Sequence, residues 1–323
     1  MRIVSLLASA TEMITALGCL DQMVGRSHEC DYPPEVLHLP LVSTVQIDVN
    51  TSSAQIDAQI KQLAHKQEMQ QDMALKALSI YAIDVEKLQE LRPDVIFTQT
   101  QCEVCAVSER DVTEAVKQLT GLEPRIISLA PYRLQDVWED LYRVGKALGR
   151  VEQAEELIKG YKKRLEHVQS STAQLVEAAG QGKKPCVAVL EWLDPLMAAG
   201  NWTPELIEYA NGESLFGEVG THSPWLTWEE LQAVDPDVII LSPCGFTLER
   251  TLQDVPLLQA HSEWRSLHAV QQGRVYAIDG NYYLNRSGPR LVESTELLSH
   301  VIWNGKSTAV DENEQAWCKV ETA

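Results

Sequence analysis

The sequence predicts an α/β fold with two similar lobes, each built on a parallel sheet flanked by helices and joined by a long backbone helix. Three observations predict this fold class. Short apolar runs typical of buried strands alternate with amphipathic helical segments. Residues 131–172 carry a helical pattern without strands. Finally, LRPDVIFTQTQC at 91–102 is echoed by VDPDVIILSPCG at 234–245, so the second half of the chain repeats the first.

The first lobe opens with a strand and a helix. The apolar run after Met1 predicts the strand, and the helix follows with Ser9 as its N-cap, Glu12 completing a capping box and Gly18 ending it. Further apolar runs predict strands in MVGRS, LRPDVIFTQ and RIISLA. This order of elements is typical of a parallel sheet with helical crossovers.

These patterns divide the chain into an N-terminal α/β lobe at 1–130, a bridging helical segment at 131–172, a C-terminal α/β lobe at 183–302 and a polar tail at 303–323. In the bridge, Gly145 and Gly149 predict a bend or break, so the segment is either one long helix or two in tandem. The acidic tail shows no period, and we expect it to be loosely packed.

Composition restricts the possible partners. With 323 residues, of which 45% are hydrophobic and 23% charged, the chain has the size of two globular domains. Its net charge of −19 repels phosphate backbones, which argues against nucleic acid and suits docking on a basic partner. No stretch approaches the roughly 20 apolar residues of a membrane span. The first residues lack a signal-peptide pattern, so we expect a cytoplasmic protein, or a periplasmic one if a leader was removed.

Two groups of polar and thiol side chains follow predicted strands. His28, Glu29 and Cys30 come after MVGRS, and Cys102 and Cys105 come after LRPDVIFTQ. Ligands of α/β lobes gather at the carboxyl ends of strands, so these residues are candidates for a binding site. The imidazole and the three thiols would suit zinc or iron. Two alternatives remain: the cysteines line a ligand pocket without metal, or they are reduced and buried in the core.

Aromatic residues form the second candidate feature. Trp192 and Trp202 flank a loop between a predicted strand and a helix, where a broad flat ligand would meet large rings with one polar group each. Packing in the core is the alternative for both residues, and we favour it for Trp228 and Trp264. In the later segment DGNYYLNRSGPRL, Tyr282 and Asn285 are candidates to bond the polar edge of a ligand, although a turn with a helix cap explains the segment equally.

Catalytic signatures are absent from the sequence. We find no GxSxG, Walker A, HExxH or post-strand GxGxxG pattern. This absence favours a binding protein over an enzyme. An enzyme with Cys30 or Cys102 as the nucleophile near His28 stays as an alternative.

Several segments together resemble one family. RIVSLLASATEMITALG, GRSHECDYPPEV, LRPDVIFTQTQCEVCAV, EWLDPLMAAGNWTPEL and GRVYAIDGNYYLNRSGPRLVES are similar to the cobalamin-binding-like branch of ABC-transporter substrate-binding proteins, in the class III periplasmic-binding-protein superfamily. The resemblance covers about residues 2–302. It implies two Rossmann-like lobes, bridged by a helix, that hold a corrinoid, heme or other metal chelate in the cleft between them.

The resemblance also implies roles for particular residues. Trp192, Trp202 and Tyr282 would contact the ligand, and the HEC and CEVC groups would face the cleft from the first lobe. Acidic residues would dock on a basic face of an ABC permease. We therefore expect a protein that binds a cobalamin-like corrinoid for uptake, storage or hand-over, with zinc or iron binding through the His/Cys group as the alternative.

Overall fold

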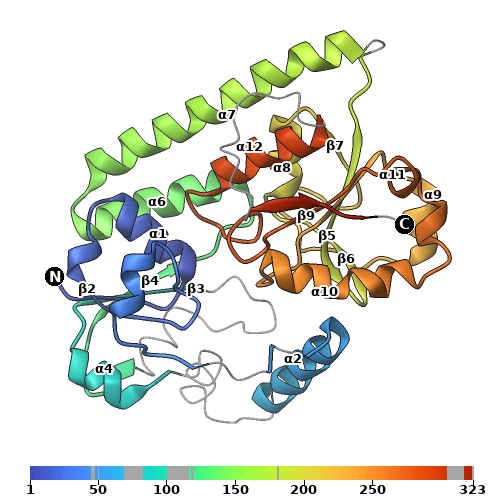
Figure 1. Cartoon of the computed structure of the whole chain (residues 1–323). Coiled ribbons are helices and arrows are strands. Elements are labelled where there is room, and N and C mark those ends of the chain that lie inside the picture. Colours follow the sequence, from blue (N-terminus) through green and yellow to red (C-terminus); the bar gives the residue numbers. More distant parts are fainter. Residues whose placement is uncertain are drawn as a thin grey trace. The chain divides into compact units, whose positions relative to one another are not determined.

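The computed structural model describes residues 1–44, 48, 49, 51–68, 83–99, 116, 117, 120–179, 182–303 and 316–321. The chain forms two compact units. Unit 1 comprises Met1–Pro131 and Gln135–Ile158, and unit 2 comprises Tyr132–Leu134 and Lys159–Ala323. Each unit is built on a sheet with parallel strands and carries helices (Figure 1), so the predicted two-lobed α/β class is confirmed.

Unit 1 is a four-stranded parallel sheet in the order β2-β1-β3-β4. Its elements, with the helices that continue from it, are β1 (Ile3–Ser5), α1 (Ala8–Ala16), η1 (Leu20–Gln22), β2 (Met23–Arg26), η2 (Pro34–His38), α2 (Ser53–Glu68), α4 (Val85–Leu91), β3 (Val95–Gln99), β4 (Arg125–Leu129), α6 (Leu134–Leu148) and α7 (Val151–Ala179). Aliphatic side chains from the strands and α4 form a fully apolar core on one face of this sheet.

Unit 2 has the sheet order β10-β9-β8-β5-β6, and β7 also pairs with β5. Its elements are β5 (Cys186–Leu193), β6 (Leu196–Ala198), α8 (Thr203–Tyr209), β7 (Glu213–Ser214), α9 (Trp228–Val234), β8 (Val238–Leu241), α10 (Leu248–Gln259), η4 (Trp264–Ser266), α11 (His268–Gln271), β9 (Val275–Ile278), α12 (Leu291–Ile302) and β10 (Trp317–Lys319). The three central strands β5, β8 and β9 are parallel. Figure 1 shows α8 and α12 on one face of this sheet and α10 on the other.

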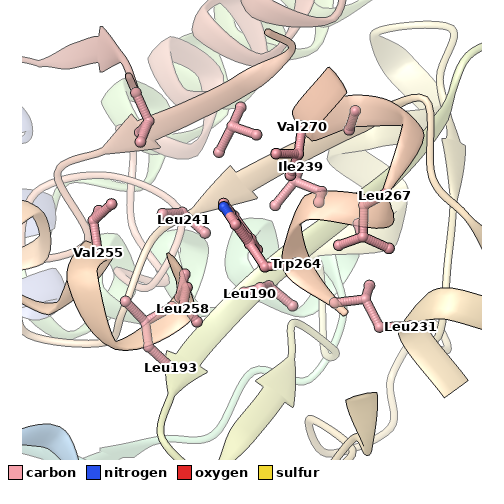
Figure 2. Close-up of a cluster of buried hydrophobic side chains, with 14 of the residues drawn as sticks. Leu190, Leu193, Leu231, Ile239, Leu241, Val255, Leu258, Trp264, Leu267 and Val270 are labelled. Atoms are coloured by element: carbon pink, nitrogen blue, oxygen red, sulfur yellow. The ribbon is translucent and has the colours of Figure 1, made fainter. Parts of the chain in front are cut away.

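The core of unit 2 is centred on Trp264, which is fully buried. Figure 2 shows its indole among Leu190, Ile239 and Leu241 of the sheet and Leu267 of the segment before α11. Trp228 packs against the same cluster, and its ring lies 6.4 Å from that of Trp264. The core role expected for these two tryptophans is confirmed.

The internal repeat has a structural cause. The preceding helix ends in a left-handed residue in both copies, Arg92 with φ 45° and Asp235 with φ 51°, and the Pro-Asp pair then leads into the strand. The Asp94 carboxylate accepts the backbone N–H of Arg2 at 2.7 Å, and that of Asp237 accepts the N–H of Cys186 at 2.9 Å. In each unit the repeated aspartate therefore fastens the start of the central strand to its neighbour.

Three expectations about the elements are settled. The bridging segment is two helices, because Gly149 takes φ 68° and the backbone turns between α6 and α7. The capping box at Ser9 and Glu12 is wrong. Helix α1 begins at Ala8, directly after the strand, and Leu7 is an N-cap without a side-chain hydrogen bond. The predicted stop at Gly18 is confirmed by its φ of 69° immediately after the C-cap.

The expected loose tail is wrong for residues 316–321. Trp317–Lys319 forms β10, which pairs antiparallel with β9. Its Trp317 ring lies 6.0 Å from Tyr276 and 5.1 Å from His300, and Val320 is buried in the core of unit 2. An unpaired edge strand offers free backbone groups to any extended segment, and here the chain's own C-terminal part pairs with them.

Candidate functional site

In unit 1, His28 and Glu29 follow the carboxyl end of β2. The His28 Nδ1 atom lies 2.8 Å from the Ser43 hydroxyl, which also accepts the His28 backbone N–H at 3.1 Å. Glu29 is exposed, and its carboxylate lies 4.0 Å from His28 Nε2. The second ring nitrogen of His28 therefore points toward a partly exposed position at this edge of the sheet, whereas the first is engaged within the unit.

Cys30 has an interior position. Its side chain is fully buried, with Sγ 3.2 Å from the Ser27 hydroxyl and 3.7 Å from the Ser5 carbonyl oxygen. Burial raises the pKa of the Cys30 thiol, although bonds from Ser27 and Thr11 oppose the rise. Metal ligation and nucleophilic attack both need a thiolate, so this surrounding favours a packed thiol over a ligand.

The four-ligand metal site stays a prediction. Cys102 and Cys105 lie outside the described residues. Within the part of the chain that the structure describes, no three or more His, Cys, Asp or Glu side chains are grouped so as to hold a metal ion. His28 and Cys30 lie on the same loop, but His28 bonds to Ser43 whereas Cys30 bonds into the core.

In unit 2, Trp202 is the N-cap residue of α8 and is almost completely buried. Its indole N–H donates to the Leu284 carbonyl oxygen at 2.7 Å. This bond joins α8 to the segment that precedes α12, and it gives Trp202 a packing role within the unit.

Trp192 has a different environment, at the end of β5. It pairs across strands with Met197 of β6, and Met197 forms an antiparallel bridge with Trp225. Directly paired residues point to the same face of a sheet, so these three side chains form a row. The Phe246 ring extends this row, 5.1 Å from the Trp192 ring. We call Phe246, Trp192, Met197 and Trp225 the aromatic strip.

Exposure increases along the aromatic strip. Phe246 and Trp192 are 5% and 7% exposed, whereas Trp225 at the other end is 52% exposed. The Trp192 indole N–H has no hydrogen-bond partner within the described residues. A buried N–H group without an acceptor is unusual and costly, and such groups occur at binding sites. The strip thus runs from the core of unit 2 to an apolar surface at Trp225.

Beside the strip, the loops that follow β8 and β9 are fastened together. The Asn281 N–H donates to the Phe246 carbonyl oxygen at 2.9 Å. A Cβ atom on Gly280 would lie 2.0 Å from the Pro243 carbonyl oxygen, so only glycine fits this approach. The Asn285 amide donates to the carbonyl oxygens of Ser242 and Gly280 at 2.9 and 3.2 Å. Asn285 therefore joins the two loops, a role that the sequence pattern alone did not indicate.

Asp279 also holds this region in place through hydrogen bonds to two backbone N–H groups. Its buried carboxylate accepts the N–H of Tyr282 at 2.8 Å and that of Leu248, the first residue of α10, at 3.1 Å. Burial raises the pKa of Asp279, and the N–H donors together with Arg286 oppose the rise. Both carboxylate oxygens are thus occupied in holding the Tyr282 turn against α10.

Two guanidinium groups lie near the Tyr282 ring. The guanidinium carbons of Arg290 and Arg286 lie 4.8 and 5.2 Å from the centre of its ring. Arg286 also donates to the Asn281 side-chain oxygen at 3.1 Å. Cation–π contacts of this kind hold the ring and concentrate positive charge, which is notable in a chain with a net charge of −19. This end of the site suits a polar or anionic group.

Together, the aromatic strip and the Tyr282 segment can bind a broad, flat ligand with a polar edge. The structure brings Trp192, Tyr282 and Asn285 to the carboxyl edge of the unit 2 sheet, where ligands of α/β folds bind. Sequence reasoning did not single out Phe246, Met197, Arg286 or Arg290 as site residues. Trp225 is placed beside Trp192 only by strand pairing, which the sequence does not show.

Comparisons with known proteins agree on one family. Residues 3–282 match the family described as periplasmic binding protein. The uncharacterized ABC transporter substrate-binding lipoprotein YvrC of Bacillus subtilis is 23% identical over 94% of this chain and 80% of its own length. The vitamin B12-binding protein of Vibrio cholerae is 23% identical over 91% of this chain and 86% of its own length.

A solved structure has the same fold. A periplasmic heme binding protein from Pseudomonas aeruginosa superposes with a TM-score of 0.68 over 96% of this chain and 95% of that chain. Its sequence identity is 19%, so the likeness concerns the fold alone.

Proposed function

The chain belongs to the periplasmic binding protein family, and from this premise we propose that it binds a tetrapyrrole-type metal chelate, with a cobalamin-like corrinoid as the first candidate. The relatives are substrate-binding proteins, and this chain is a binding protein rather than an enzyme. The aromatic strip carries the proposal. Its exposed Trp225, in one row with Met197 and Trp192, offers a flat surface of the kind that suits the face of a large ring system.

The cationic end of the site supports the same ligand class. Corrinoids and hemes are flat at the centre and carry amide or carboxylate groups at the periphery. Arg286 and Arg290 lie about Tyr282 and would meet such a periphery. The vitamin B12-binding relative places the corrinoid first, and the heme-binding structure makes heme the comparison ligand. The position of the ligand between two lobes stays a prediction from the sequence.

A titration tests the proposal. The purified chain is titrated with cyanocobalamin and, separately, with hemin, and visible absorption and tryptophan fluorescence are recorded. We expect saturable quenching with one of the two probes, together with a shifted visible band. If neither probe changes either signal, the proposed ligand class is wrong. Elemental analysis of the purified chain before either probe is added tests the zinc or iron alternative that involves His28, Cys30, Cys102 and Cys105.

The names of the relatives also support a location and a partner. They include a lipoprotein and proteins called periplasmic, which supports a periplasmic location and gives no support to the cytoplasmic location expected from the first residues. Among the helices of the described residues, none is long and apolar enough to cross a membrane. ABC-transporter substrate-binding proteins deliver small ligands to a permease, and the net charge of −19 supports docking on a basic permease face.

A further inference from the structure

Phe246 connects several parts of the unit 2 site. Its ring lies 5.1 Å from that of Trp192, at the end of β5. Its carbonyl oxygen accepts the N–H of Asn281, in the loop after β9, and its own N–H donates to Pro243 in the loop after β8. Phe246 therefore contacts the aromatic strip through its ring and the turn that carries Tyr282 through its backbone.

An ion pair also contacts the Phe246 ring. The guanidinium carbon of Arg250 lies 4.3 Å from the centre of the Phe246 ring. Arg250 donates to both oxygens of Asp254, at 2.8 and 3.3 Å. The side chains of Arg250 and Asp254 are 17% and 7% exposed. The Phe246 ring thus contacts both a fixed guanidinium and the Trp192 indole.

The pair is poorly arranged for stabilising its own helix. Arg250 lies in the first turn of α10, where the helix dipole disfavours a cation. The order is also the weaker one for an i,i+4 pair, since the cation precedes the anion. Burying both charges costs free energy that a surface pair would avoid. A role outside the helix explains the arrangement better than helix stability does.

We propose that Arg250, oriented by Asp254, is a positioning residue for ligand binding: it holds Phe246 against Trp192 and so fixes the buried end of the aromatic strip. The inference rests on the proposed function. Arginine suits this role because its planar group stacks on a ring while its N–H fork bonds a carboxylate. Lysine keeps the charge but cannot do both, so the two residues are not interchangeable here.

The test is a double-mutant cycle between Arg250 and Phe246, with cyanocobalamin and hemin as probes. We expect R250Q to weaken binding of the accepted probe about tenfold, and R250K to weaken it by an intermediate factor. In an F246L background, R250Q should add less than twofold, because the residue acts through the ring. R265Q, which removes an exposed arginine of the same unit, is the charge-matched control and should bind as the wild type does.

Two further measurements separate positioning from stability. The R250Q/D254N variant leaves no unpaired buried charge, so its Tm should approach that of the wild type while its affinity stays low. The fluorescence of Trp192, obtained as the difference between each protein and its W192F version, should change in ligand-free R250Q. If R250Q/D254N recovers its affinity with its Tm, or if the Trp192 emission of R250Q is unchanged, the inference is overturned. If the wild type binds neither probe, the proposed function fails, and the Trp192 emission still decides the positioning role.

Discussion

The two sheets use the side chains at the carboxyl ends of their parallel strands differently. In unit 1, the Cys30 thiol after β2 turns inward toward Ser5 and Ser27, and one ring nitrogen of His28 is engaged with Ser43. In unit 2, the corresponding edge presents rings and guanidinium groups, and its exposure increases toward Trp225. The comparison teaches that the chemically conspicuous residues of a sequence need not be its accessible ones. We therefore expect ligand affinity to depend on unit 2 residues more than on His28 or Cys30.

A buried carboxylate lies near the carboxyl edge of each sheet, and the two carboxylates differ in how many of their oxygens accept hydrogen bonds. Asp140 of α6 accepts the N–H of Ala130, just beyond β4, and pairs with Arg143 at 3.1 Å. Its second oxygen has no hydrogen-bond partner within the described residues. Asp279 instead uses both oxygens, on Tyr282 and Leu248. The buried charge of Asp140 is therefore only partly satisfied by hydrogen bonds, whereas the charge of Asp279 is used to hold two segments together.

The largest expected effect concerns Asp140. Burial raises its pKa from 3.8 to about 6, against the lowering effect of Arg143. Because the folded chain holds this proton more tightly than the unfolded chain does, the contribution of Asp140 to stability is fully present below about pH 4, is lost as the pH rises to about 6, and is constant above. The shift corresponds to up to about 3 kcal/mol. Asp140→Asn should therefore be more stable than the wild type at pH 8, as measured by urea unfolding.

The comparison at low pH is the control for this prediction. Wild type and Asp140→Asn should converge at about pH 3, below the ordinary pKa of 3.8, where the carboxyl is mostly protonated in both the folded and the unfolded chain. Equal stability of the two proteins at pH 8 would mean that Arg143 compensates the charge fully.

Trp225→Ala should give the next largest effect. The residue forms the exposed end of the aromatic strip, and truncating such an anchor raises the Kd about a hundredfold, or about 3 kcal/mol. Since the side chain is 52% exposed, the free energy of unfolding should change by less than about 0.5 kcal/mol. Isothermal titration with the accepted probe measures the first quantity and urea unfolding the second. Val234→Ala, at another exposed apolar position of unit 2, should leave the affinity unchanged.

Asp279→Asn sharpens the contrast between the two carboxylates. An asparagine has one acceptor oxygen, so the N–H of either Tyr282 or Leu248 loses its partner, at a cost of about 1–2 kcal/mol. The raised pKa of Asp279 acts in the opposite direction, because removing the buried charge is favourable. We expect a net loss of about 1 kcal/mol in urea unfolding and severalfold weaker ligand binding. A gain in stability like that of Asp140→Asn would show that the two carboxylates play equivalent roles.

The smallest effects should come from the unit 1 edge. Cys30→Ala and His28→Ala should each change the affinity for the accepted probe less than twofold. In native protein at pH 8, iodoacetamide should modify the exposed Cys244 well before the buried Cys30, whose thiol has a raised pKa. Peptide mass spectrometry follows both sites. Rapid modification of Cys30, or a tenfold loss of affinity in His28→Ala, would contradict the contrast between the edges.

Much of the fold could be predicted from the sequence. The strands, the repeat and the tandem helices follow from periodicity and from residues such as Gly18 and Gly149, whose backbone conformation is a local property. The capping box at Ser9 failed because the chain enters α1 directly from the strand. The C-terminal strand was missed because its pairing with β9 depends on a partner some 40 residues earlier in the chain.

For the candidate site, too, local features could be predicted from the sequence, whereas features that depend on distant pairing could not. The sequence by itself determined two α/β units, the repeated Pro-Asp pair before their central strands, and the presence of aromatic residues near strand ends. Only the tertiary structure decided which of them act together. Trp192, Met197 and Trp225 become neighbours through strand register, and Phe246 joins them from the next loop. Register and burial depend on the whole sheet, because each strand takes its position from partners distant in the chain, and no local pattern contains that information.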